Sequence, residues 1–235
     1  MMNPAIERTT TLTFEGTREP RWVYAINPQK ILVTGRHYRL AKRTLDLALV
    51  ILLMPVWLPI IGLCALLVKL TGWNGPVLFH QPRTGRGGRR FMMLKFRTMV
   101  PNAEELKKDL AHLNKLEWPD FKISRDPRIT RVGRLLRRSS LDELPQMFNV
   151  LWGDMSLVGP RPTSFASKTY RLWQTERLDV LPGITGLWQI LGRGSTEFQE
   201  RLRMDIAYIE RRCLWLDAQI LVRTISSILS QRGAY

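Results

Sequence analysis

The chain has 235 residues with 45% hydrophobic side chains, which is enough for one ordinary domain with a core and excludes a disordered protein. Its formal net charge is +16 and arginines outnumber lysines about three to one, so we expect anionic partners and forked recognition of phosphate groups. Two cysteines and three histidines, without metal-ligand spacing, exclude a disulfide framework and a zinc site. The remaining classes of partner are nucleic acid, an acidic membrane surface and phosphorylated substrates.

The first segment, residues 1–38, is a polar arm rich in Thr, Arg and Pro and without hydrophobic periodicity. No apolar stretch lies near its start, so a signal peptide is not expected. We divide the rest of the chain into an apolar, membrane-associated segment over residues 39–70 and a folded domain over residues 71–235.

The apolar segment contains an uncharged run, Leu47–Val68, whose 22 residues would cross a bilayer as a straight helix. Pro55 and Pro59 interrupt this run, and each proline removes a helical hydrogen bond, so a kink near the centre is expected. Both flanks are basic, and basic flanks prefer the cytoplasmic side of a membrane. These features favour a re-entrant helix–break–helix, while a kinked single-pass helix remains the alternative.

The folded domain is predicted to begin with a β-hairpin. Strands are expected over Val77–Phe79 and Phe91–Met99, and the basic glycine loop Arg83–Gly88 lies between them. Helices are expected over residues 103–116, 126–138, 139–151, 170–178, 197–212 and 215–230. Because helices dominate and the strands are few and short, we predict an α+β fold.

One predicted helix, at residues 126–138, is basic and amphipathic. Arg128, Arg131, Arg134 and Arg137 recur every third residue, and apolar side chains occupy another face. Such a helix can lie on an anionic membrane leaflet with its arginines among the phosphates. A simple solvated face is the alternative.

The adjacent acids Asp142 and Glu143 follow this run of arginines at the start of a predicted helix. From local pattern alone they complete a capping box with Ser140 and complement the helix dipole. In the functional interpretation, Arg137 and Arg138 neutralise a pyrophosphate beside them. One carboxylate then attacks phosphorus, and the other holds a divalent metal or moves a proton.

Cations at three further places suit phosphate binding. Lys95 and Arg97 point to the same face of a predicted strand, where they could meet a transferring phosphoryl group. Pro160 and Pro162 restrict the backbone around Arg161 and lower the entropy lost when its guanidinium is ordered. The pattern is weaker at the third place, where the flanking residues are glycines and the cation is Arg193.

In order along the chain, the following motifs resemble the bacterial sugar transferase family, the monotopic polyprenyl-phosphate phosphoglycosyl transferases: Lys42–Asp46, Gln81–Gly85, Lys95–Met99, Asp126–Thr130, Ser140–Gln146, Gly153–Ser156, Gly159–Pro162, Pro182–Gly186, Gly192–Arg193 and Asp205–Tyr208. The resemblance covers about residues 39 to 235. No single motif is specific, but so many in one order are.

The resemblance implies a re-entrant membrane helix docked on a small cytosolic catalytic domain, at the cytoplasmic face of the bacterial inner membrane. It implies transfer of a sugar-1-phosphate from a UDP-sugar to polyprenyl (undecaprenyl) phosphate. UMP is released, and a covalent phosphosugar on the attacking aspartate is the intermediate. This would be the first membrane step of exopolysaccharide or other glycoconjugate synthesis. The expected partners besides the two substrates include the phospholipid membrane and no nucleic acid. A homodimer is one candidate assembly, and the sequence leaves the oligomeric state open.

The resemblance also implies roles for single residues. Asp142 is the expected nucleophile, and Glu143 assists it; the two acids are the expected ligands of Mg²⁺. The expected phosphate or nucleotide contacts are Lys95, Arg97, Arg137, Arg161 and Arg193. Asp205 is expected to support the site, together with Pro160 and Pro162.

Three features depart from the family pattern or narrow it. The membrane helix usually breaks at Ser-Pro, and the matching pair here is Leu58–Pro59, which lacks the hydroxyl. Gly194 stands where Asn is common. The ending Arg232–Tyr235 resembles exopolysaccharide-initiating members and favours a hexose donor, galactose or glucose.

A non-catalytic basic scaffold on the membrane remains the alternative function.

Overall fold

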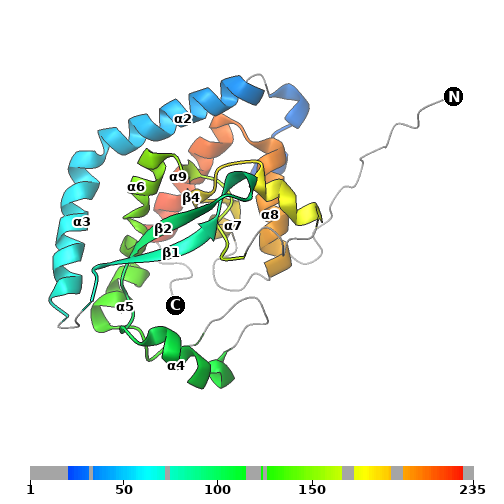
Figure 1. Ribbon diagram of the computed structural model, residues 1–235. Coiled ribbons are helices and arrows are strands. Elements are labelled where there is room, and N and C mark those ends of the chain that lie inside the picture. Colours follow the sequence, from blue (N-terminus) through cyan, green and yellow to red (C-terminus); the bar gives the residue numbers. More distant parts are fainter. Residues whose placement is uncertain are drawn as a thin grey trace.

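The computed structural model describes residues 21–31, 34–71, 75–114, 123, 126–165, 172–191 and 198–229 (Figure 1). Helices dominate these residues and strands are few and short, which confirms the predicted α+β class. The α-helices are α1 (Arg21–Tyr24), α2 (Gly35–Leu52), α3 (Met54–Lys69), α4 (Ala103–Asp109), α5 (Arg131–Arg138), α6 (Gln146–Trp152), α7 (Leu187–Leu191), α8 (Phe198–Arg211) and α9 (Leu214–Leu229). The strands are β1 (Leu78–Thr84), β2 (Arg90–Phe96), β3 (Ser156–Val158) and β4 (Gly183–Thr185).

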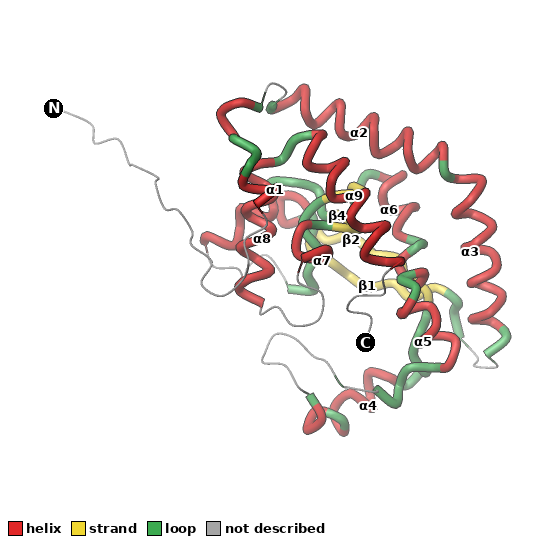
Figure 2. The backbone as a smooth tube through the Cα atoms, turned by 180° about the vertical axis from the view of Figure 1, so that it is seen from behind, coloured by secondary structure: helices red, strands yellow, loops and turns green. Residues whose placement is uncertain are grey.

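Helices α2 and α3 form a bent arm along one edge of the molecule, and α6 lies inside the bend (Figures 1 and 2). The two helices meet at Leu53 with a bend of 62°. Trp57 contacts Phe148 of α6 edge to face, with ring centroids 5.3 Å apart, so an aromatic pair links the arm to the domain.

The position of the bend corrects the expectation that the helix breaks at Leu58–Pro59. Pro55 lies in the first turn of α3, where its missing N–H costs little, whereas its ring would clash with a continuing α2. Pro59 is accommodated inside α3. The indole N–H of Trp57 donates to the Val50 carbonyl at 2.8 Å, so a side chain satisfies a backbone group that the bend releases.

No single helix among the described residues combines the length and the hydropathy needed to cross a membrane. The pair α2 and α3 meets both criteria only when the two helices are taken together across their bend.

The predicted hairpin is confirmed. Strands β1 and β2 pair antiparallel, with Leu78 opposite Phe96 and Thr84 opposite Arg90, and the turn of Arg86–Gly88 connects them. Gly87 and Gly88 have φ of 64° and 77°, which favours glycine at both positions of this turn. The hairpin crosses the middle of the molecule beside α6 (Figure 1).

A second sheet lies in the main hydrophobic core. Strands β3 and β4 pair in parallel, and Val158 of β3 is buried together with Val150 of α6 and Leu216 and Ile220 of α9. Gly159 and Gly183 pack backbone against backbone, because a Cβ on Gly183 would lie 2.1 Å from the Gly159 nitrogen. This close approach fixes the start of the proline-rich loop that follows β3.

A smaller core joins the arm to the hairpin and to the basic helix. Cys64 and Val68 of α3, Phe96 of β2 and Leu136 of α5 are its buried members. Gly133 makes this packing tight, since a Cβ there would lie 2.0 Å from the Thr98 carbonyl oxygen. As a result, the end of α5 and the residues after it are held against strand β2.

Candidate active site

The acid pair lies in a short 3₁₀ turn, Leu141–Glu143, directly after α5. Ser140 has φ of 58°, a left-handed conformation that is uncommon outside glycine, and it reverses the chain between the helix and the turn. Its side chain makes no capping hydrogen bond, so the capping-box interpretation is wrong. Instead the Glu143 side chain turns toward the hairpin and the proline-rich loop.

Glu143 is held by two cations from distant parts of the chain. The Lys95 ammonium of β2 lies 2.7 Å from Glu143 Oε1, and the Arg161 guanidinium binds both carboxylate oxygens, at 2.5 and 3.3 Å. Burial alone would raise the pKa of Glu143, but Arg161 and Lys95 outweigh it and hold the pKa well below its usual range. Glu143 is therefore a fixed anion.

Asp142 has a different environment, although it is the next residue. Within the part of the chain that the structure describes, we find no hydrogen bond to its half-buried carboxylate. Burial raises its pKa and the charge of Glu143 raises it further, while Lys95, Arg137 and Arg161 act in the opposite direction. Asp142 thus combines open oxygen lone pairs with cations close by, as a nucleophile for an anionic phosphate requires.

Arg137 reaches the same place from the last turn of α5. Its Nε donates to the Thr98 hydroxyl at 2.8 Å, an interaction made possible by the close packing of α5 on the end of β2. Lys95, Arg137 and Arg161, expected at phosphate contacts, are therefore gathered around the acid pair.

Arg97 is placed differently. The predicted alternation of exposed and buried side chains holds for Arg90–Met93 of β2 and is lost after Met93, and the strand ends at Phe96. The Arg97 guanidinium packs against Gly75, where a Cβ would lie 2.0 Å from its Nη1. Its expected contact with phosphate stays a prediction. Arg193 lies outside the described residues.

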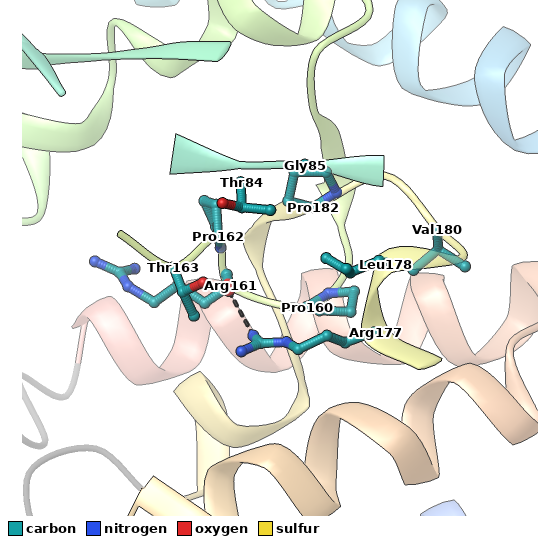
Figure 3. Close-up of a pocket in the computed structure, with 10 residues that line it drawn as sticks. All are labelled: Thr84, Gly85, Pro160, Arg161, Pro162, Thr163, Arg177, Leu178, Val180 and Pro182. Atoms are coloured by element: carbon teal, nitrogen blue, oxygen red, sulfur yellow. Dashed lines mark hydrogen bonds between the residues drawn. The ribbon is translucent and has the colours of Figure 1, made fainter. Parts of the chain in front are cut away.

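Arg161 belongs to the loop that follows β3, and this loop is held mainly through its carbonyl groups. Prolines have no N–H to donate, and the carbonyls of Pro160 and Thr163 accept from the backbone N–H groups of Gly183 and Thr84, at 2.9 and 3.0 Å. Arg177 donates to the Arg161 carbonyl at 2.6 Å (Figure 3). The same loop lines a shallow pocket together with Thr84, Gly85, Leu178 and Pro182.

Asp205 of α8 lies behind this loop and does not touch the acid pair. It is 2% exposed and pairs with Arg177 at 2.6 Å. Burial raises the pKa of Asp205, and Arg177 opposes the shift. Arg177 was missed in the sequence because it occurs in an ordinary polar helix without a motif, and no local signal marks it.

The acid pair fits a magnesium ion only in one binding mode. No group of three metal-binding side chains occurs among the described residues. Glu143 Oε1 accepts from both Lys95 and Arg161, whereas Glu143 Oε2 accepts one longer hydrogen bond from Arg161, at 3.3 Å. Among the described residues, Glu143 Oε2 and the Asp142 carboxylate therefore retain lone pairs for a metal ion. Mg²⁺ is commonly bound by one or two carboxylates plus substrate phosphates, so these donors suit that mode and no all-protein cage.

The structure thus places the two acids among cations and next to an apolar helix pair, as the family resemblance predicts for a site of phosphate chemistry. The chain belongs to the bacterial sugar transferase family, whose family model matches residues 37–231. Galactosyl transferase CpsE of Streptococcus agalactiae is 40% identical over 226 residues, which cover 94% of this chain and 48% of the relative.

Two further relatives have names that state a reaction. Undecaprenyl-phosphate galactose phosphotransferase of Salmonella typhimurium is 42% identical, over 85% of this chain and 43% of the relative. UDP-glucose:undecaprenyl-phosphate glucose-1-phosphate transferase of Caulobacter vibrioides is 43% identical, over 83% of this chain and 72% of the relative. The chain thus spans about half the length of the first two of these relatives and most of the third.

Proposed function

We propose that the protein transfers a sugar-1-phosphate from a UDP-sugar to undecaprenyl phosphate, with UMP as the second product. The observation that carries this proposal is the contrast within the acid pair. Glu143 is locked by Lys95 and Arg161, while the Asp142 carboxylate accepts no hydrogen bond from the described residues and faces the same cations. The names of the relatives support the donor and the acceptor.

The reaction proceeds in two displacements at one phosphorus atom. An Asp142 oxygen attacks the sugar-bearing phosphorus of the donor, the bond to the bridging oxygen breaks, and UMP leaves with the electron pair. This step leaves an acyl phosphate that carries the sugar. An oxygen of undecaprenyl phosphate then attacks the same phosphorus and releases the Asp142 carboxylate, so the nucleophile is regenerated.

The surrounding cations stabilise the charge that develops on the phosphoryl oxygens. Lys95, Arg137 and Arg161 come from three different elements and are fixed before substrate binds, which is the condition for electrostatic stabilisation of a transition state. Mg²⁺ would be held by Asp142, by Glu143 Oε2 and by substrate phosphate, and when bound it supplies charge neutralisation of the diphosphate.

The apolar arm is the proposed membrane attachment, with the active site at the cytoplasmic face of the bacterial inner membrane. Ten of the nineteen exposed large hydrophobic side chains among the described residues lie in Leu40–Leu70. A patch of this kind is costly in water and marks a binding surface. The exposure is greatest around the bend, where Leu52 is 74% exposed, so the bend is the part we place deepest in lipid.

The test is UMP release by the detergent-solubilised protein with magnesium, undecaprenyl phosphate and a panel of UDP-sugars. Asp142→Asn should abolish release, and with UDP-sugar alone the unaltered protein, but not Asp142→Asn, should gain the mass of a phosphosugar. Asp109→Asn is the matched control, because Asp109 is an exposed aspartate on α4, away from the acid pair.

Full turnover by Asp142→Asn would contradict the covalent step. A protein that releases no UMP with any donor, yet stays folded and membrane-bound, would favour the non-catalytic scaffold.

A further inference from the structure

A buried arginine outside the acid pair connects helix α8 to the loop that carries Arg161. Arg177 is 7% exposed, and its Nη2 atom donates both to Asp205 Oδ2 and to the Arg161 carbonyl, each at 2.6 Å. Figure 3 shows this guanidinium directed at the Arg161 backbone. A buried charged donor that bonds two acceptors, one on α8 and one on the loop, holds these two elements in one geometry.

The residue that Arg177 holds is the one whose side chain fixes Glu143. The Arg161 backbone is held by Arg177, and its guanidinium forks onto the carboxylate. The neighbouring prolines cannot donate hydrogen bonds, so the loop depends on donors from outside at this point. A chain of contacts therefore runs from Asp205 through Arg177 and Arg161 to Glu143.

We propose that Arg177 is a positioning residue, which Asp205 orients and which sets the place of the Arg161 guanidinium at the acid pair. The inference deepens the proposed function and rests on it. Neither Arg177 nor Asp205 contacts the acid pair in the structure, so both act through Arg161.

The expected consequence of losing Arg177 is local. The loop would shift, Arg161 would leave Glu143, and the acid pair would lose one of its three nearby cations. Since misplacement by about 1 Å can cost 10²-fold in rate, UMP release should fall by about 10- to 100-fold.

The variants must remove the contact without leaving a buried charge. Arg177→Met alone leaves Asp205 buried and unpaired, which threatens folding. The double variant Arg177→Met/Asp205→Leu replaces both charges by apolar groups of similar shape, an exchange that proteins often tolerate. Arg203→Met is the matched control, because Arg203 is exposed on the same helix as Asp205.

Two measurements separate positioning from simple loss of structure. The first is hydrogen exchange of the full-length protein in detergent. Exchange should rise in peptides that cover residues 156–165 of the double variant and stay unchanged in peptides from α5 and α6. The second is the split between the KM for the UDP-sugar and the single-turnover rate of UMP release at saturating donor. The rate should fall about 10- to 100-fold, because Arg161 would no longer be held at the acid pair, whereas Arg203→Met should leave both quantities unchanged.

Unchanged exchange at 156–165 would overturn the inference at any level of activity. So would a loss confined to KM, with the single-turnover rate at saturating donor unchanged. If the unaltered protein releases no UMP, the proposed function fails, and the exchange data still decide whether Arg177 holds the loop.

Discussion

The neighbouring carboxylates of Asp142 and Glu143 have pKa values that are shifted in opposite directions, because different groups surround each of them. Glu143 is neutralised by Lys95 and Arg161, and its pKa is held low, while burial and the charge of Glu143 raise the pKa of Asp142. Environments that separate the pKa values of two acids are a common way to give them different chemical roles. The fixed anion organises the cations, and the other acid is left to react.

This contrast predicts the pH dependence of the first displacement. Asp142 must be ionised to attack, so UMP release should be lost when the pH falls below the pKa of Asp142. Because that pKa is raised, the loss should occur above about pH 3.9, the pKa of an ordinary aspartate. Glu143→Gln removes a negative neighbour and should move this acidic limb to lower pH. Single-turnover release with UDP-sugar alone is the measurement, since the phosphate of the carrier also titrates.

An acidic limb at the ordinary aspartate value, unchanged in Glu143→Gln, would contradict the assignment of the limb to Asp142.

Metal binding is predicted to depend on the nucleotide. Because the available oxygens come from two adjacent side chains, Mg²⁺ or Mn²⁺ should bind weakly to the free protein and more tightly when UDP supplies phosphate oxygens. Titration of Mn²⁺ by electron paramagnetic resonance, with and without UDP, measures this directly. Asp142→Asn should reduce the gain caused by UDP, and equal affinity in both states would contradict the shared site.

Features of the candidate site that lie close together in the sequence could be predicted from it. Contacts between residues far apart in the sequence could not. An acid pair after a run of arginines is visible in the sequence. The locking of Glu143 is not, since Lys95 lies 48 residues before it and Arg161 18 residues after it. The capping interpretation was wrong because Ser140 has a left-handed backbone and its side chain makes no capping hydrogen bond, and no local sequence signal marks that conformation.

At the scale of elements, the bend between α2 and α3 shows that two prolines in one apolar run have different effects on the helix. Both Pro55 and Pro59 interrupt an apolar run, and local pattern does not say which one breaks the helix. In the structure Pro55 lies in the first turn of α3, and Pro59 lies inside the helix. The kink itself was therefore predictable, while its position was not.

Replacing each proline by alanine in turn tests the assignment of the bend to Pro55. Pro55→Ala restores a backbone donor and removes the ring that prevents α2 from continuing, so the arm should straighten, whereas Pro59→Ala should leave the bend unchanged. Spin labels at exposed His37 and Leu70 report the change. Complete straightening would lengthen their separation by roughly 7 Å, given 1.5 Å of rise per residue. If instead Pro59→Ala lengthens the distance between the two spin labels and Pro55→Ala does not, Pro59 causes the bend.

At the scale of the whole molecule, α2 is joined to the core by a buried polar network. Asp217 of α9 accepts from the Tyr38 and Tyr208 hydroxyls at 2.9 and 2.7 Å and lies 3.2 Å from the Lys42 ammonium. Nearby, the Ser156 hydroxyl donates to Asp46 at 2.6 Å. This network fixes the polar half of the arm on the domain that carries the acid pair.

Loss of the central acid should therefore weaken the whole protein. Asp217→Asn leaves Lys42 without a buried partner and forces an amide N–H toward hydroxyl donors, which should cost about 3 kcal/mol. For a chain of this size that corresponds to a fall in Tm of roughly 6–12 °C. Thermal unfolding in detergent, followed by circular dichroism, provides the measurement. Asp109→Asn, at an exposed site, is the control, and an equal Tm for both variants would rule out the network as a stabilising element.

The last prediction concerns the position of the arm in the membrane. Helices bent by 62° direct their far ends back toward one side, and the residues at the bend are exposed and apolar. The flanks are basic on both sides, from Arg36 to Arg43 and from Lys69 onward, and basic flanks prefer the cytoplasmic face.

Single cysteines at His37 and Leu70, in a chain with Cys64→Ala and Cys213→Ala, should therefore react with a membrane-impermeant maleimide from the same face. Labelling should occur in inverted vesicles and fail in intact spheroplasts, whose outer surface is periplasmic. Because UDP-sugars are made in the cytosol, this orientation also gives the acid pair access to its proposed donor. Labelling of the two positions from opposite faces would show that the arm crosses the bilayer, and the basic residues beyond one flank would then lie outside the cell.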